Sequence, residues 1–146
     1  MIRIAIDGPG GAGKSTIAKL VGDKLGLEYI DTGAMYRAVG LKLNRKGIKP
    51  DDLISISNVL EETTIDFVNG KIILDGDDVS DIIRTQEISK FASIYSQIPE
   101  VRSKLVDIQR RIAAGKSVIM DGRDIGTNVL TDAELKIFLT ADSMVR

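Results

Sequence analysis

Eight consecutive residues near the N-terminus match the pattern G-x-x-x-x-G-K-S, which can bind the phosphates of a nucleoside triphosphate. They are Gly8, Pro9, Gly10, Gly11, Ala12, Gly13, Lys14 and Ser15, and Thr16 follows as a second hydroxyl. The glycines let backbone amides converge on phosphate oxygens, and the positive end of the following helix strengthens that interaction. Lys14 can reach the β- and γ-phosphates, and Ser15 can ligate Mg²⁺. We therefore predict binding of ATP or a similar triphosphate; the alternative is a glycine-rich turn without a ligand.

A second polar group, Asp31-Thr32-Gly33-Ala34-Met35-Tyr36-Arg37, follows an expected strand. Ligands of α/β proteins bind at the carboxyl edge of the sheet, which is where this group should lie. Thr32 can contact a ligand there, or it can simply cap the next helix. Arg37, one turn further on, can hold an anionic substrate, although a lone arginine on a helix is usually solvated.

A third group, Asp121-Gly122-Arg123-Asp124-Ile125-Gly126-Thr127, follows another expected strand. Asp121 or Asp124 can bind Mg²⁺ through water, and Arg123 can bridge phosphates. The alternative is an internal ion pair between an aspartate and Arg123 that holds the loop. Both can be true, because a paired arginine is also an oriented one.

A fourth group of polar residues is spread over the helical region that precedes this loop. It consists of Arg84, Thr85, Gln86, Ser93 and Arg102. Arg102 and Gln109 are seven residues apart, so we expect them to share a helix face. The basic run Arg110-Arg111 is expected to be solvated helix surface.

Strands and helices alternate along the chain and must position these groups. Apolar runs predict buried strands at residues 2–6, 27–30, 117–120 and 135–139. Helical spacing predicts helices at 14–25, about 33–45, 53–60 and from about residue 85, and a last helix from Pro99 to a stop at Gly115. The expected apolar stripes are Ile17, Leu20, Val21 and Leu25 in the first helix, and Val101, Leu105, Ile108 and Ile112 in the last. The alternation predicts an α/β layered fold with a parallel sheet.

The middle of the chain has a different character. Residues 63–68 and 71–74 are rich in β-forming side chains, and Asn69-Gly70 between them is a strong hairpin signal. Residues 75–78 are expected to form another turn. We interpret this stretch as a small β-containing insertion in the alternating chain.

Composition limits the chemistry and the partners of the protein. The chain has 146 residues, a formal net charge of -1, and neither cysteine nor histidine. Disulfides, thiol catalysis and imidazole chemistry are therefore excluded, and carboxylates, lysine, arginine, hydroxyls and Mg²⁺ are left. That set suits phosphoryl transfer, which needs positioning and charge neutralisation. We expect no nucleic acid partner, no membrane span and no signal peptide, and a cytoplasmic location.

Taken together, these motifs resemble the bacterial cytidylate kinase family, whose members phosphorylate CMP and dCMP with ATP. The resemblance covers essentially the whole chain, 1–146, and rests on Ile6 to Pro9 leading into the phosphate loop, on Asp31 to Arg37, on Ile83 to Glu87, and on Asp121 to Thr127. It implies a three-layer P-loop nucleoside monophosphate kinase fold with a parallel sheet, acting as a monomer. Residues 41–83 resemble the enlarged monophosphate-binding insertion of the family.

The resemblance also implies roles for single residues. Thr32, Tyr36 and Arg37 match the motif that touches the acceptor monophosphate, and Ser93 and Arg102 match the pyrimidine and ribose pocket. Arg123 and Asp124 match the phosphate site, and with Lys14 they are the expected catalytic residues. Ser15 is the expected ligand of the Mg²⁺ that accompanies ATP.

The chain departs from the family pattern at its end, where the family continues with an arginine-bearing lid, a further aspartate near the cytosine, and a C-terminal strand and helix. We therefore expect a fragment that is weakly active or inactive alone, because lid arginines stabilise the transferring phosphoryl group. The expected last strand would also lie open at an edge.

Other functions stay open on the residues alone. Another small P-loop kinase, with AMP, dTMP or shikimate as acceptor, would use Arg37 in the same way. A GTPase switch lacks support because no Asn-Lys-x-Asp motif is present. A non-catalytic nucleotide-binding module is the remaining alternative.

Overall fold

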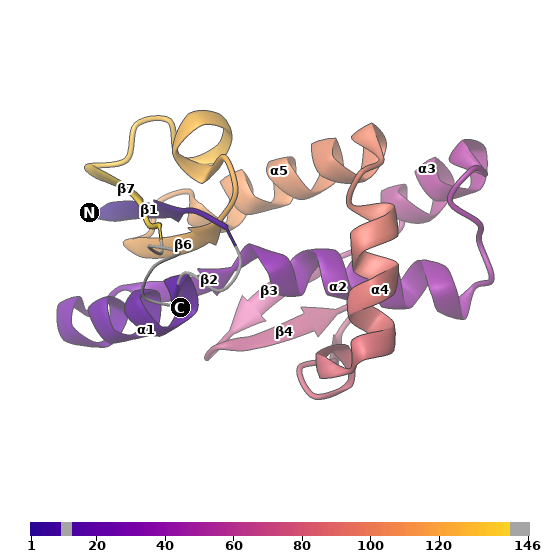
Figure 1. The fold of residues 1–146 in the computed structure, drawn as a ribbon, viewed down its shortest axis with the longest axis horizontal. Coiled ribbons are helices and arrows are strands. Elements are labelled where there is room, and N and C mark those ends of the chain that lie inside the picture. The colour runs from indigo at the N-terminus through magenta and orange to yellow at the C-terminus, as the bar shows by residue number, and fades with distance from the viewer. Residues whose placement is uncertain (10–12, 141–146) are drawn as a thin grey trace. The chain divides into compact units, whose positions relative to one another are not determined.

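The protein folds as two compact units. A computed structural model describes residues 1–9 and 13–140 (Figure 1). The first unit contains the chain up to Thr32 and again from Gln109 onward, and the second contains Gly33–Ile108. Gly10, Gly11 and Ala12 of the phosphate loop lie outside the described residues. No helix in the described part of the chain is long and apolar enough to cross a membrane.

The first unit is built on a parallel sheet, as the alternation predicts. Its strands are β1 (Arg3–Asp7), β2 (Glu28–Asp31), β6 (Val118–Gly122) and β7 (Leu135–Phe138), in the order β2-β6-β1-β7. Each of the three pairings is parallel. The two central strands, β1 and β6, carry fully buried runs, because parallel strands covered on both faces need apolar side chains throughout. β7 is an edge strand of the described sheet, and its Phe138 is 70% exposed.

Helix α1 (Lys14–Leu25) has the predicted bounds, but its buried face differs from the predicted one. Ile17, Leu20 and Leu25 are exposed, while Ala18 and Gly22 are buried. A Cβ on Gly22 would lie 3.1 Å from the carbonyl oxygen of Leu27 and 3.2 Å from a methyl group of Ile119. The helix therefore packs through its small residues, which let its backbone approach the sheet more closely than leucine would allow.

The second unit contains most of the helices and a separate small sheet. Its elements are α2 (Thr32–Arg45, which starts on the last residue of the first unit), α3 (Leu53–Glu61), β3 (Ile65–Val68), β4 (Lys71–Leu74), β5 (Asp77–Asp78), η1 (Ile82–Arg84), α4 (Gln86–Tyr95) and α5 (Pro99–Ala113), the last of which continues into the first unit. Pro99 is the first residue of α5, as predicted. The predicted stripe of α5 is also confirmed, because all four of its apolar residues are buried.

The predicted hairpin forms, and a third strand joins it. Val68 pairs with Lys71, and both residues of the Asn69-Gly70 turn have positive φ, 51° and 78°. The prediction of a turn over residues 75–78 is only half right. Asp75 and Gly76 turn the chain, but β5 then pairs antiparallel with β4. Two exposed aspartates carry no apolar alternation, so periodicity could not reveal this strand.

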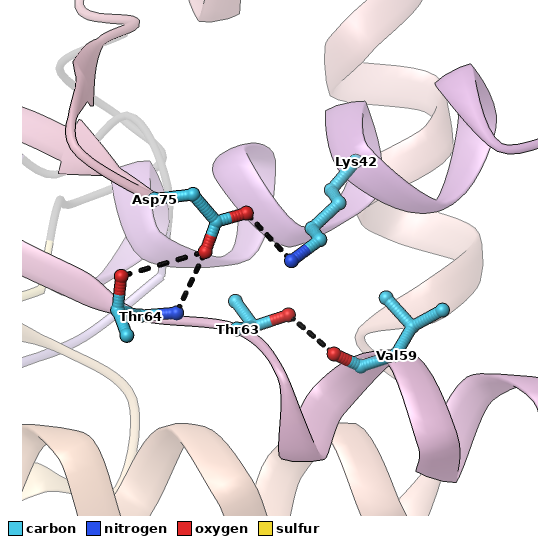
Figure 2. A network of polar contacts seen from close by, with 5 residues as sticks. All are labelled: Lys42, Val59, Thr63, Thr64 and Asp75. Carbon is cyan, nitrogen blue, oxygen red and sulfur yellow. Dashed lines mark hydrogen bonds and ion pairs between the residues drawn. The ribbon is translucent and has the colours of Figure 1, made fainter.

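The small sheet is fastened to α2 by one carboxylate (Figure 2). Asp75 forms an ion pair of 2.6 Å with Lys42 of α2 and accepts a 2.8 Å hydrogen bond from the amide of Thr64. Burial raises the pKa of the Asp75 carboxyl, but the hydrogen bonds from Lys42 and Thr64 outweigh it, so the pKa is lowered overall. Next to it, the buried Thr63 hydroxyl donates to the carbonyl of Val59 at the end of α3.

Candidate nucleotide-phosphate site

Three loops with predicted chemistry lie at one edge of the parallel sheet. In the strand register Asp7 is opposite Gly122, and Asp31 is opposite Asp121. The chain leaves each of these strands at its carboxyl end, so the phosphate loop, Thr32 and the loop after β6 start from neighbouring positions. The sequence-based prediction that these three segments share an edge is confirmed.

Two positions of the phosphate loop, Gly8 and Gly13, have backbone conformations or surroundings that require glycine. Gly8 is buried with φ 150°, and a Cβ there would lie well under 3.0 Å from the carbonyl oxygen of Leu139. Gly13 caps α1 in the left-handed conformation, with φ 85°. Lys14 follows at the first position of α1, and its Nζ donates a 2.6 Å hydrogen bond to the carbonyl of Gly8. The lysine amine is thus folded back over the start of the loop.

The hydroxyls at the start of α1 are accessible. Ser15 and Thr16 are exposed in the first turn, where the helix has no acidic side chain. A helix N-terminus without acidic neighbours favours an anion. Mg²⁺ that arrives with a nucleotide takes one or two protein oxygens, and phosphates and waters supply the others, so the Ser15 hydroxyl fits this use. Among the described residues, no group of three or more acidic, histidine or cysteine side chains could hold a metal ion.

Thr32 is built tightly into the edge of the sheet. It is 3% exposed, and its Oγ1 donates a 2.8 Å hydrogen bond to the carbonyl of Asp121. A Cβ at Gly122 would lie well under 3.0 Å from this Oγ1. The structure thus gives Thr32 a packing role that joins the start of α2 to the end of β6, in addition to any contact with a ligand.

The side chain of Asp121 is held by a tyrosine that sequence reasoning missed. Asp121 is 4% exposed, and its Oδ2 accepts a 2.7 Å hydrogen bond from the hydroxyl of Tyr29. Tyr29 lies in β2, in a stretch that reads as an ordinary strand. Asp121 is accordingly an internal, oriented carboxylate, whereas Asp124 is exposed.

The loop after β6 contains a turn of π-helix, η2 (Ile125–Val129), that the spacing did not predict. Asp124 precedes it with φ 59°, a left-handed conformation that is uncommon for residues other than glycine. Asp7 accepts hydrogen bonds from the amides of Ile125 and Gly126, at 2.7 and 2.9 Å. Arg123 and Asp124 remain exposed at the edge of the sheet.

The far end of η2 is held by a residue expected to be solvated surface. Arg110, near the end of α5, donates from Nε to the carbonyl of Asn128 at 3.1 Å, and its Nη2 donates to the same oxygen. Arg110 is exposed, but it is an anchor for the loop after β6. The predicted exposure of Arg110-Arg111 on the helix surface is confirmed, but the spacing gave no sign of the contact with Asn128, because a contact between distant segments leaves no trace in the local pattern.

The remaining predicted site residues belong to the second unit. Tyr36 and Arg37 are half-buried on α2, while Ser93 on α4 and Arg102 on α5 are exposed. The Ser93 hydroxyl donates a 3.1 Å hydrogen bond to the carbonyl of Ser89, one turn earlier. We expected Arg102 and Gln109 to share a helix face. Gln109 is buried and Arg102 is exposed, so the two residues lie in different environments.

A parallel sheet whose first strand runs into a glycine-rich loop, followed by a helix that starts with Lys14, defines a P-loop nucleotide-binding protein.

The family model for cytidylate kinase matches residues 4–146. Among curated relatives, cytidylate kinase of Caldicellulosiruptor saccharolyticus is 57% identical, over 99% of this chain and 66% of its own length. That of Caldanaerobacter subterraneus is 56% identical, over 96% of this chain and 62% of its own length. That of Clostridium tetani is 48% identical, over 99% of this chain and 64% of its own length. The chain belongs to the cytidylate kinase family, and it spans slightly less than two thirds of these relatives.

Proposed function

We propose that this protein transfers the γ-phosphoryl group of ATP to CMP or dCMP and so forms CDP or dCDP. The observation that carries the proposal is the shared sheet edge of the first unit. There Lys14 and the start of the phosphate loop lie next to the loop that bears Arg123 and Asp124. A donor site and a second phosphate-binding segment on adjacent strand ends suit transfer between two phosphates. The curated relatives named above, all called cytidylate kinase, support the same activity.

The chemistry asks little of the protein beyond positioning and charge. A phosphate oxygen of CMP is already ionised at neutral pH, so it can attack the γ-phosphorus of ATP in line without a general base. A chain without histidine is compatible with this reaction. Lys14 would leave the Gly8 carbonyl and neutralise charge on the β- and γ-phosphates. Mg²⁺, held through Ser15, would supply further charge neutralisation on those phosphates.

The acceptor residues are proposed from the family resemblance. Thr32, Tyr36 and Arg37 would contact the acceptor phosphate, with Arg123 and Asp124 serving the same phosphate site. Ser93 and Arg102 would contact the pyrimidine and ribose. Cytosine offers an exocyclic amino donor, which hydroxyl or carboxylate acceptors can recognise. The insertion at 41–83 would enclose the acceptor, and the protein would act in the cytoplasm as a monomer.

A panel of acceptors tests the substrate. The full-length protein with ATP and Mg²⁺ is given CMP, dCMP, UMP, AMP and dTMP separately, and the diphosphate products are measured by chromatography. We expect CDP and dCDP as the main products. Faster turnover of AMP or dTMP would replace the cytidylate proposal with another small P-loop kinase. ATP binding without turnover of any acceptor would favour a non-catalytic nucleotide-binding module.

Lys14→Ala tests the donor site. We expect kcat to fall by about 100-fold or more, because a charge aimed at the transferring group is lost. Lys24→Ala, the same change at an exposed position in the last turn of α1, is the matched control and should leave kcat unchanged. A Lys14→Ala protein with full ATP affinity and full turnover would rule out the enzymatic proposal.

A further inference from the structure

We propose that Asp7 is a positioning residue for phosphoryl transfer, because its carboxylate holds the loop that carries Arg123 and Asp124 against the base of the phosphate loop. The proposal rests on the function proposed above and adds a residue to it. Asp7 belongs to neither the predicted donor set nor the predicted acceptor set. It was missed because an aspartate between a buried strand and a glycine loop resembles an ordinary strand end.

The Asp7 carboxylate accepts two hydrogen bonds, one on each oxygen. Oδ1 of Asp7 lies 2.7 Å from the amide nitrogen of Ile125, and Oδ2 lies 2.9 Å from that of Gly126. Both oxygens thus bind successive backbone N–H groups, and hydrogen bonds to an ionised carboxylate are stronger than neutral ones. Gly126 allows this close approach, because even a Cβ there would be only 3.5 Å from Oδ2 and 3.2 Å from the side chain of Lys136.

These two bonds act on the residues that precede them. Asp124, directly before Ile125, has φ 59°, a left-handed conformation that is uncommon outside glycine, although aspartate adopts it more readily than most residues. With the next two amides fixed by Asp7, the backbone of Asp124 has little freedom to relax, and the direction of the exposed Arg123 and Asp124 side chains is set.

The same residue also defines the start of the phosphate loop. Asp7 is the last residue of β1, its carbonyl accepts a 2.8 Å hydrogen bond from the amide of Leu139, and Gly8 follows directly. Its backbone therefore belongs to the donor side of the site, while its side chain points to the segment that bears Arg123. Removing the carboxylate should disturb the acceptor side and leave the donor side intact.

The test is Asp7→Asn in the full-length protein. The asparagine amide has the size of the carboxylate but only one acceptor oxygen, and its NH₂ group would face one of the two amide N–H groups. We expect kcat/KM for CMP to fall by at least about tenfold, while the Kd of a non-hydrolysable ATP analogue changes less than about twofold. Asp66→Asn, the same change at an exposed carboxylate that accepts from the adjacent Phe67 amide, is the control and should change neither value.

A double-mutant cycle separates positioning from general destabilisation. If Asp7 acts through Arg123, Asp7→Asn should cost little further activity in an Arg123→Ala background. Independent, additive losses would overturn the proposal, as would an equal loss of affinity for the ATP analogue, or unchanged kcat/KM for CMP. Thermal unfolding shows first whether the variant is folded at the assay temperature.

If Asp7→Asn does not fold, Arg110→Met carries the test, because Arg110 fixes the other end of the same turn at Asn128. A smaller loss of kcat/KM for CMP, again with unchanged affinity for the ATP analogue, would support the proposal, and no loss would refute it. A full-length wild-type protein that phosphorylates no acceptor refutes the proposed function, and this proposal falls with it. Wild-type turnover with an unaffected variant refutes this proposal alone.

Discussion

Replacing Gly122 with alanine adds a single methyl group where the edge of the sheet has no room for it. The new Cβ would lie well under 3.0 Å from Oγ1 of Thr32, and 3.0 and 3.1 Å from side-chain carbons of Ile125. The Ile125 side chain can move to relieve these contacts. Thr32 is buried, and its hydroxyl is already bonded to the carbonyl of Asp121, so it must give up that bond or move the start of α2.

The cost combines two terms. Overpacking a tight site costs about 1–3 kcal/mol, and losing a buried hydrogen bond costs about 1–3 kcal/mol more. We therefore expect Gly122→Ala to lower the free energy of unfolding by about 2–6 kcal/mol. This can be measured by urea denaturation. Gly47→Ala is the control, because a Cβ there meets open space and only its positive φ, 67°, opposes it, at about 1 kcal/mol.

The cause of the loss can be isolated with Thr32→Ala, which removes the hydroxyl that the new methyl group meets. In that background Gly122→Ala should cost about 2 kcal/mol less than it does alone. Equal costs in both backgrounds would show that the Thr32 contact is not the reason. A cost below about 0.5 kcal/mol for Gly122→Ala alone would refute the packing argument altogether.

Three further predictions concern single contacts, and each can be checked by urea denaturation. Lys42→Met should destabilise the protein by about 1 kcal/mol at about pH 7. Because the pKa of Asp75 is lowered in the folded protein, the stability difference between Lys42→Met and wild type should persist above the pKa of the unfolded carboxyl and shrink as the pH falls toward about 3. The same stability difference at about pH 7 and about pH 3 would refute this prediction. Gly40→Ala should cost about 1–3 kcal/mol, because its Cβ would lie 3.0 Å from a backbone nitrogen of α4; a neutral result would mean that α4 moves freely. Tyr29→Phe should cost about 1–2 kcal/mol by removing one hydrogen bond from the buried Asp121 carboxylate, and a variant as stable as wild type would show that this bond adds nothing.

The sequence predicted best what depends on neighbouring residues. The hairpin followed from Asn69-Gly70, and the predicted bounds of α1, residues 14–25, are confirmed, with Gly26 at φ 68° directly after the helix. The position of the three loops followed from a general property of parallel sheets, since each loop comes directly after a strand. In these cases a local signal and the fold agree, so the prediction needed no knowledge of distant contacts.

The features that the sequence did not reveal depend on contacts between distant segments. The apolar spacing of α1 suggested a face containing Leu20, which is 56% exposed, because periodicity counts large apolar residues and overlooks Gly22. The sequence predicted that Arg110 is solvated, and only the structure shows that it donates a hydrogen bond to the Asn128 carbonyl. The sequence around Asp7 and Tyr29 did not indicate a role for either residue. Their hydrogen-bond partners lie in distant segments of the chain, which a local pattern does not show.

Within the loop from Asp121 to Thr127, the structure separates residues that build the loop from residues that can act. Asp121, Ile125 and Gly126 are buried, and Gly122 is half-buried against the Thr32 hydroxyl. The exposed members are Arg123, Asp124 and Thr127. The glycines of this motif therefore serve close packing and have no need to touch a phosphate, unlike those expected in the phosphate loop. A motif match alone cannot distinguish these uses, whereas exposure does, and it leaves Arg123 and Asp124 as the charged side chains of this loop that can meet a substrate.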